Sequence, residues 1–98
     1  MTTSALERTE LNATGASVSD DALVVELADG RTISAPLAWY PRLLHATKPE
    51  RDDLRLIGGG RGIHWPDIEE DISVASVIAG RPSQEGAASL KRWLATHK

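Results

Sequence analysis

The sequence ALVVELADGRTISA, residues 22–35, contains the clearest structural signal in the chain and decides the fold. Alternate residues from Leu23 to Leu27 are apolar, and this period of two is typical of a strand with one buried face. Ile33 and Ala35 repeat the same period after an Asp-Gly turn signal. The two segments therefore predict a β-hairpin.

The turn of this hairpin follows from which side chains must face each other. A two-residue loop would pair Glu26 with Ile33 and would mix polar and apolar side chains on each face. A three-residue loop instead pairs Val25 with Ile33, so that each face keeps one kind of side chain. This loop requires Gly30 in the left-handed conformation of a β-bulge. We expect the three-residue bulged turn.

The rest of the chain predicts short elements that are bounded by proline, glycine and capping residues. We expect helices over 41–46, 47–53, 74–79 and 83–98, strands over 54–57 and 63–65, and an acidic loop over 67–71. A further short strand over 16–19 is an alternative to an irregular start. The resulting ββααββαα order predicts an α+β fold, in which short helices pack on one face of a small, mostly antiparallel sheet.

The length of 98 residues leaves room for one hydrophobic core. We divide the chain into a flexible N-terminal arm (1–15), an α+β core domain (16–80) and a C-terminal helix that packs on the core (81–98). The chain is 41 % hydrophobic and 26 % charged, which is typical of a small single globular domain. Its only aromatic residues are three tryptophans and one tyrosine, so Leu, Ile, Val and Ala must supply most of the core.

Several features bear on where the protein works. The chain has no cysteine, which excludes disulfides and thiolate metal sites and fits a reducing compartment. The first 15 residues are polar and lack the apolar region of a signal peptide. No apolar run approaches the roughly 18 residues that a membrane helix needs. We expect a cytoplasmic protein that does not contact a membrane.

The net charge of −3 is divided into blocks along the chain. Residues 1–30, 31–61, 62–72 and 73–98 carry −5, +3, −4 and +3, respectively. Direct nucleic-acid binding is disfavoured, because it needs a concentrated basic face and the chain as a whole is acidic. We expect neighbouring blocks to pair their charges on a solvated surface.

The glycine run over 58–62 has the composition of a phosphate-binding loop but not its context. A P-loop needs a lysine and a hydroxyl residue beside the last glycine and a helix behind it. Here the chain continues as Ile63, His64, Trp65 and Pro66, which reads as a strand that proline ends. The run therefore predicts a hairpin turn.

A histidine and four nearby acids have the residue types of a metal site, but their spacing does not complete one. The acids are Asp67, Glu69, Glu70 and Asp71. His64 alternates away from Ile63 and Trp65, and neither a second close histidine nor an EF-hand glycine is present. No nucleophile elbow surrounds any serine. We predict no catalytic residue, no metal and no cofactor, and we expect that the protein is not an enzyme.

Two aromatic segments, 39–42 and 64–66, contain the residue types that are most enriched at binding hot spots. Trp65 is favoured as a core residue over an interface residue, while both alternatives stay open for Trp39. The candidate interaction residues are Trp39, Tyr40, Arg42, Arg61, His64, Trp65, Asp67, Glu69, Glu70 and Asp71.

Five blocks of the sequence resemble a known family. They are ADGR (28–31), PLAWYPRL (36–43), LIGGG (56–60), GIHWPD (62–67) and EDISV (70–74). Together they resemble the small bacterial family known as domain of unknown function 2442, over roughly residues 15 to 80. The tail over 81–94 is similar to a C-terminal extension found in a subset of members.

The resemblance implies a compact α+β fold and a bacterial or phage origin, and the family offers no established catalytic residue to carry over. Members occur alone, joined to a helix-turn-helix domain, or encoded beside another small protein in an arrangement similar to toxin–antitoxin pairs. This chain ends without space for a complete DNA-binding domain after the last predicted helix, which disfavours direct DNA reading.

These observations predict a protein–protein interaction or regulatory module, an antitoxin-like partner of another small protein that is encoded nearby. An exposed hairpin edge would also permit a homodimer. Two alternatives remain open. One is a nucleic-acid-associated accessory domain that uses Arg42, Arg51, Arg55 and Arg61. The other is a small metal- or ligand-binding enzyme around His64.

Overall fold

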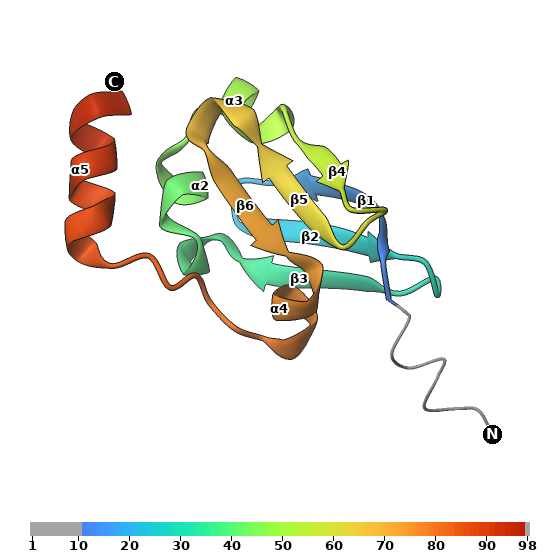
Figure 1. Ribbon diagram of the computed structural model, residues 1–98. Helices are drawn as coiled ribbons and strands as arrows, with labels where there is room; N and C mark the ends of the chain where they lie inside the picture. The colour runs from blue at the N-terminus through green and yellow to red at the C-terminus, as the bar shows by residue number, and fades with distance from the viewer. Residues whose placement is uncertain (1–10, 98) are drawn as a thin grey trace.

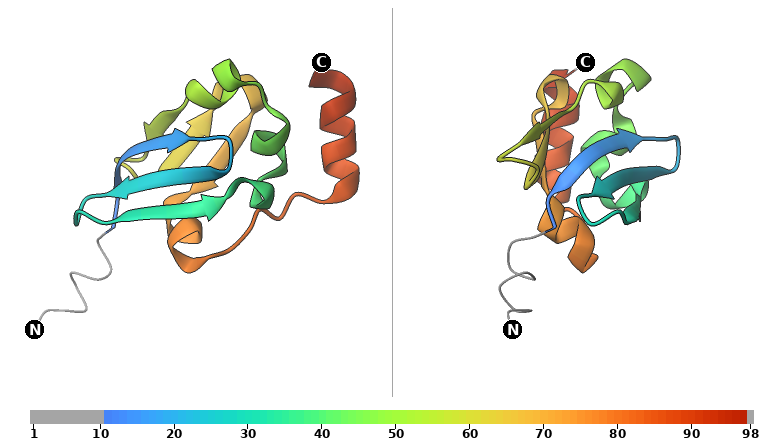
Figure 2. Two further views of the ribbon diagram at one scale, coloured as in Figure 1. Left: turned by 180° about the vertical axis from the view of Figure 1, so that it is seen from behind. Right: turned by 90° about the vertical axis from the view of Figure 1, so that its right-hand side faces the viewer.

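Two three-stranded antiparallel sheets form the body of the protein in the computed structural model, which describes residues 11–97 (Figure 1). The first sheet consists of β1 (Ala13–Val18), β2 (Ala22–Leu27) and β3 (Thr32–Pro36). The second consists of β4 (Arg55–Ile57), β5 (Gly62–Trp65) and β6 (Glu70–Ser73). The strands lie in chain order within each sheet, and the two sheets form separate layers (Figure 2).

The predicted hairpin and its bulged turn are confirmed. Val25 lies opposite Ile33 in the β2–β3 register. Gly30 has a φ of 95°, which a residue with a side chain adopts only at a steric cost. The N–H of Leu27 donates to the carbonyl of Arg31 at 2.8 Å and closes the three-residue loop. The matching of apolar side chains across the pair therefore selects the turn, as the sequence predicts.

The helices are short, and three of them, over 41–45, 48–52 and 74–79, begin or end at the residues that the sequence marks. The helices are η1 (Leu37–Trp39), α2 (Pro41–His45), α3 (Lys48–Asp52), η2 (Pro66–Ile68), α4 (Val74–Ala79) and α5 (Ala87–His97). Thr47 and Glu50 form a capping box at the start of α3, in which each side chain accepts the other residue's backbone N–H. Gly80, with a φ of 75°, ends α4.

The last helix starts later than the sequence predicts. Ser83 is expected to cap it, but α5 begins at Ala87. The Ser83 hydroxyl instead accepts the N–H of Glu85 at 3.1 Å, in a local turn that precedes the helix. Residues 81–86, between α4 and α5, therefore have no regular secondary structure.

The α+β class and the antiparallel pairing are confirmed, but the fold contains two sheets rather than a single one.

The predicted acidic loop over 67–71 is wrong at Glu70 and Asp71, which belong to β6. Glu69, with a φ of 53°, reverses the chain between η2 and β6. Acidic residues have low strand propensity. The acidic residues of β6 therefore favour a loop in the sequence, although pairing with β5 and burial of Ile72 stabilise a strand.

The first sheet also begins earlier than the sequence indicates. β1 starts at Ala13, within the segment 1–15 that the sequence assigns to a flexible arm. The Ala13 side chain is buried, and its N–H donates to the carbonyl of Gly60 at 2.7 Å. Residues 1–10 of the predicted arm lie outside the described residues.

The core lies between the two sheets. Its fully buried side chains include Leu23 and Val25 of the first sheet and Ile63 and Trp65 of the second. The sheets therefore cover each other's apolar faces, and the short helices close the rim of the core (Figures 1 and 2). Trp93 of α5 is buried at the edge of the same cluster. Within residues 11–97, no helix has the length and apolar character needed to cross a bilayer.

Candidate functional site

The outward-pointing residues of the second sheet form a distinct surface. Because β4, β5 and β6 pair in register, alternate residues of neighbouring strands form rows on one face. Ile63, Trp65 and Ile72 point into the core. The rows on the opposite side, which we name the outer face, contain Arg55, His64 and Asp71 in one row and Ile57, Gly62 and Ser73 in the next.

A groove of about 410 Å³ opens on this outer face. It is lined by Ile57, Gly58, Arg61, Gly62, Asp71, Ile72 and Ser73. The missing side chain at Gly62 lets the Ile57 side chain lie close against β5, because a Cβ there would lie 3.2 Å from Cγ1 of Ile57. The volume falls within the range of small ligand sites in proteins. The groove therefore suits a few side chains or a small molecule.

The residues around the groove combine apolar surface with unpaired positive charge. Ile57 of the edge strand β4 is 43 % exposed on the outer face, whereas Leu56 pairs with Ile63 and belongs to the opposite row. Arg55 and Arg61 are also exposed, and neither forms an ion pair with any residue in the range 11–97. An exposed apolar side chain beside unpaired arginines has the residue types of a protein-binding surface.

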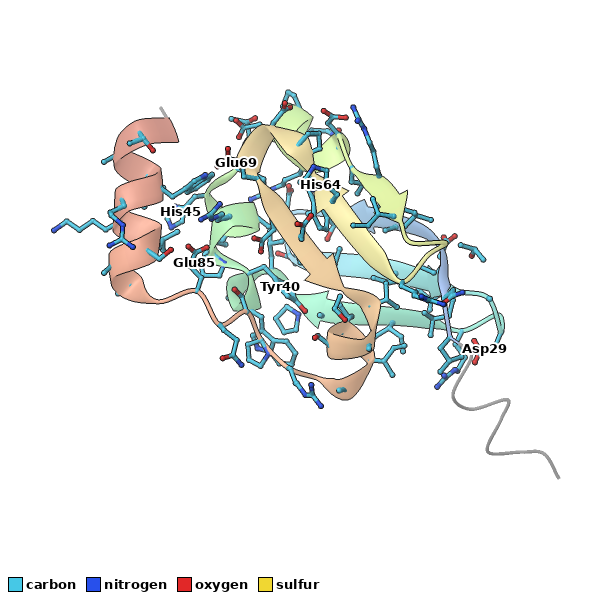
Figure 3. All side chains as sticks on the ribbon, in the orientation of Figure 1. Asp29, Tyr40, His45, His64, Glu69 and Glu85 are labelled. Carbon is cyan, nitrogen blue, oxygen red and sulfur yellow. The ribbon has the colours of Figure 1, made fainter. Side chains whose placement is uncertain are left out.

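His64 and Asp71 form a polar pair beside the groove. His64 Nδ1 and Asp71 Oδ1 lie 2.5 Å apart across the β5–β6 ladder. Figure 3 shows His64 on the second sheet. The sequence places Asp71 in a loop away from this histidine, and the structure corrects that placement. In the described part of the chain, no group of three His, Cys, Asp or Glu residues is arranged to hold a metal ion.

A second polar cluster centres on Arg42, which the sequence marks as an interaction residue. Its guanidinium donates to both carboxylate oxygens of Glu85, at 2.8 and 3.1 Å. It also donates to the carbonyls of Ile68 and Glu69, at 3.2 and 3.1 Å. The guanidinium carbon lies 5.2 Å from the centroid of the Trp93 ring. Arg42 therefore binds other parts of its own chain.

The neighbouring carboxyl groups have altered acidities. Glu70 is turned inward on β6, and burial raises its pKa to about 7 against the opposing effect of Arg42. The charges of Glu85 and Asp71 add to the rise. The hydrogen bonds from Arg42 hold the pKa of Glu85 below its usual value. Glu70 is thus the group in this cluster that titrates near neutrality.

Tyr40 lies beside this cluster and is almost completely buried. Its hydroxyl has no hydrogen-bond partner among the described residues. Burial raises the pKa of Tyr40, and the charge of Glu70 contributes to the rise. Tyr40 is therefore a core residue, which corrects its assignment to an interaction surface.

The remaining predicted residues divide between core and surface. Trp65 is fully buried and its indole N–H donates to the carbonyl of Arg51 at 3.0 Å, so it is a core residue rather than a binding residue. Trp39 is half-buried against the core. Asp67 and Glu69 are exposed at the turn before β6. Of the ten candidates, only Arg61, His64 and Asp71 lie on or beside the outer face.

Sequence reasoning missed the contributions of Ile57, Gly62 and Glu85. A signal for the first two was present, because the predicted glycine turn between two strands sets Ile57 opposite Gly62 on the same face as His64. No comparable signal existed for Glu85, since its partner Arg42 is distant in the chain.

Comparisons with known proteins identify a family and a similar fold. Residues 13–83 match the family model described as "Protein of unknown function (DUF2442)". A comparison with curated proteins finds no match. The crystal structure of a protein of unknown function from Rhodospirillum rubrum is similar, with 24 % identity and a TM-score of 0.69. The similarity covers 84 % of this chain and 99 % of that chain, and it supports the fold alone.

Proposed function

The chain belongs to the DUF2442 family of proteins of unknown function, and from that premise we propose that it is a protein-interaction module. It binds a small partner protein through the outer face of β4–β6 and regulates that partner in the manner of an antitoxin. The observation that supports this proposal is the groove beside the exposed apolar strand β4.

The distribution of exposed apolar residues favours this surface. Among the described residues, the exposed large hydrophobic side chains are Leu44, Leu56 and Ile57. Two of the three, Leu56 and Ile57, are consecutive on the edge strand β4, so their side chains point to opposite sides, and Ile57 is the one on the outer face. Proteins usually protect edge strands with charges, proline or a covering element. Exposed apolar residues on such an edge favour a bound partner over a free surface.

The expected partner is a protein encoded beside this chain in the genome. The alternating charge blocks of the sequence offer electrostatic complementarity to such a partner, which would speed association and exclude wrong partners. A chain without cysteine suits a reducing cytoplasm, where we place the complex.

Co-expression with the product of the adjacent gene tests the proposal. The two proteins should co-elute from a size-exclusion column at micromolar concentration. Separate elution under these conditions would count decisively against an antitoxin-like role. The column would also show whether the isolated chain is a homodimer.

A pair of variants tests the surface itself. Ile57→Arg places a charge on the apolar wall of the groove and should abolish co-elution. Leu44→Arg makes the same change at a residue of equal exposure, 44 % against 43 %, on α2 away from the outer face. This control should leave the complex intact. Equal effects of the two changes would refute the assignment of the outer face.

The nucleic-acid alternative has less support in the arrangement of the arginines. Arg42 is bound to Glu85, and Arg51 donates to the carbonyls of Leu43 and Leu44, both at 2.9 Å. Of the four arginines that it requires, Arg55 and Arg61 stay available, which is a small basic footprint for binding phosphates. The alternative of a small metal- or ligand-binding enzyme around His64 is supported by the hydrogen bond between His64 and Asp71. It has no support from a metal site, because the described residues contain no group of three suitable ligands.

A further inference from the structure

The groove also indicates what kind of segment it binds. We propose, resting on the proposed function, that it receives a short acidic–apolar segment of the partner protein. An apolar side chain of that segment packs on Ile57, and a neighbouring carboxylate pairs with Arg61.

The apolar part of the proposal rests on the floor and one wall of the groove. Gly62 contributes no side chain, and the Ile57 side chain lies directly beside it, within 3.2 Å of the position that a Cβ would take. Ile57 is 43 % exposed, so a partner side chain that packs here would remove apolar area from water. The groove volume of about 410 Å³ holds a few side chains rather than a helix or a domain face.

The acidic part rests on charge. The protein carries −3 overall, yet the outer face presents Arg55 and Arg61 without ion-pair partners among residues 11–97. A guanidinium binds a carboxylate through two parallel hydrogen bonds, which supplies orientation as well as attraction. A partner segment with Asp or Glu therefore complements this part of the surface better than a basic or neutral segment does.

The position of Asp71 sets the direction in which the segment binds. Asp71 lines the groove, is hydrogen-bonded to His64 and belongs to β6, whereas Arg61 lies next to Gly62 in the β4–β5 turn. A carboxylate placed beside Asp71 would be repelled, while one placed beside Arg61 would be attracted. The acidic residue of the segment must therefore lie at the Arg61 end of the groove.

The test uses the purified complex with the product of the adjacent gene and measures its Kd by isothermal titration calorimetry. Arg61→Glu should weaken binding by at least about tenfold, because it replaces attraction with repulsion. Arg61→Lys should weaken it less, since a lysine keeps the charge and loses the two-point geometry. Arg92→Glu is the matched control, because Arg92 is exposed on α5 at the far end of the molecule from the groove (Figure 1).

A charge exchange then identifies the partner's carboxylate. Each Asp and Glu of the partner is changed to Arg and combined with Arg61→Glu. One exchange should restore binding to within about threefold of the wild-type complex, and the thermal midpoint of each variant shows that it is folded. Rescue at one position confirms the proposal, and the absence of rescue at every position overturns it.

The remaining outcomes separate this inference from the proposed function. If Ile57→Arg breaks the complex but Arg61→Glu behaves as Arg92→Glu does, the outer face binds a partner and the acidic segment is refuted. If no complex forms with the wild-type chain, the proposed function fails and this inference fails with it. If the wild-type chain binds a short DNA duplex at low salt and Arg61→Glu abolishes that binding, the arginines serve phosphates and the proposal is overturned.

Discussion

Arg42 and Glu85, which are 43 residues apart in the chain, are joined by two hydrogen bonds of 2.8 and 3.1 Å. Their side chains are only 17 % and 8 % exposed. The pair links α2 to the segment that leads into α5, and the Trp93 ring covers the guanidinium. Because the family match ends at residue 83, one arginine within the matched region holds the C-terminal helix beyond it.

Replacing Arg42 with Met should therefore loosen the C-terminal helix. The variant leaves the Glu85 carboxylate partly buried without its cation, which we expect to cost about 2–3 kcal/mol of unfolding free energy. Urea unfolding measures the loss, and a red shift of tryptophan emission reports exposure of Trp93. Arg31→Met, which removes an exposed pair with Asp29, is the control and should change stability little. Similar losses in both variants would contradict a special role for Arg42.

The acidity of Glu70 predicts a pH-dependent stability. Its pKa in the folded protein is about 7, and its ordinary value is 4.5. Between these two pH values the folded state keeps a proton on Glu70 that the unfolded state has lost. Unfolding free energy should fall as pH rises from 4.5 to 7 and level off above that range. Glu70→Gln should remove this contribution and make the protein more stable than wild type by about 2 kcal/mol at pH 8.

Urea titrations at a series of pH values measure this effect as the difference between the variant and the wild type. The difference removes the contributions of other carboxyl groups, such as Glu85, whose lowered pKa acts in the opposite direction. A difference that does not change between pH 5 and pH 8 would show that the Glu70 carboxyl is not shifted.

Two adjacent glycines should respond differently to alanine. Gly59 has a φ of 70° and open space around a new Cβ, so Gly59→Ala should cost about 1 kcal/mol of strain. At Gly60 the φ is 96° and a Cβ would lie 2.3 Å from the carbonyl oxygen of Ala13. Gly60→Ala must displace backbone and should cost about 3 kcal/mol or more. Thermal unfolding ranks the two, and equal midpoints would contradict this account of the turn.

The Tyr40 hydroxyl offers a test in the direction of greater stability. It is buried without a hydrogen-bond partner among the described residues, and burying a hydroxyl group without such a partner costs free energy. Tyr40→Phe should leave stability unchanged or raise it by up to about 1 kcal/mol. Chemical denaturation measures the change. A loss of more than about 1 kcal/mol would mean that the hydroxyl makes a stabilising contact.

Local patterns predicted the parts of the fold that neighbouring residues determine. The register of Val25 against Ile33 and the bulge at Gly30 followed from matching apolar side chains across a short turn. The start of the helix predicted over 47–53 likewise depends on residues within one helical turn, where Thr47 and Glu50 form a capping box. In each case the side chains that decide the structure lie close together in the sequence.

The parts that could not be predicted depend on distant contacts. β6 is a strand because β5 pairs with it and the core buries Ile72, although its acidic residues favour a loop. The two-layer arrangement likewise depends on one sheet burying the other. Of the candidate site, Arg61, His64 and Asp71 could be named from sequence, but not the pairing of His64 with Asp71 on one face. The partner of Arg42 lies too far along the chain for any periodicity to reveal it.

The first sheet depends on later parts of the chain, and this has a consequence for biosynthesis. The N–H of Ala13 donates to the carbonyl of Gly60, and β2 is buried in the same core cluster as Trp65. The first hairpin leaves the ribosome with its apolar face exposed to water, because the second sheet, which covers that face, is translated later. Such an uncovered sheet is prone to aggregate or to attract chaperones. Nascent chains halted before β5 should therefore be digested readily by protease, and protection should appear only once Trp65 has emerged from the exit tunnel.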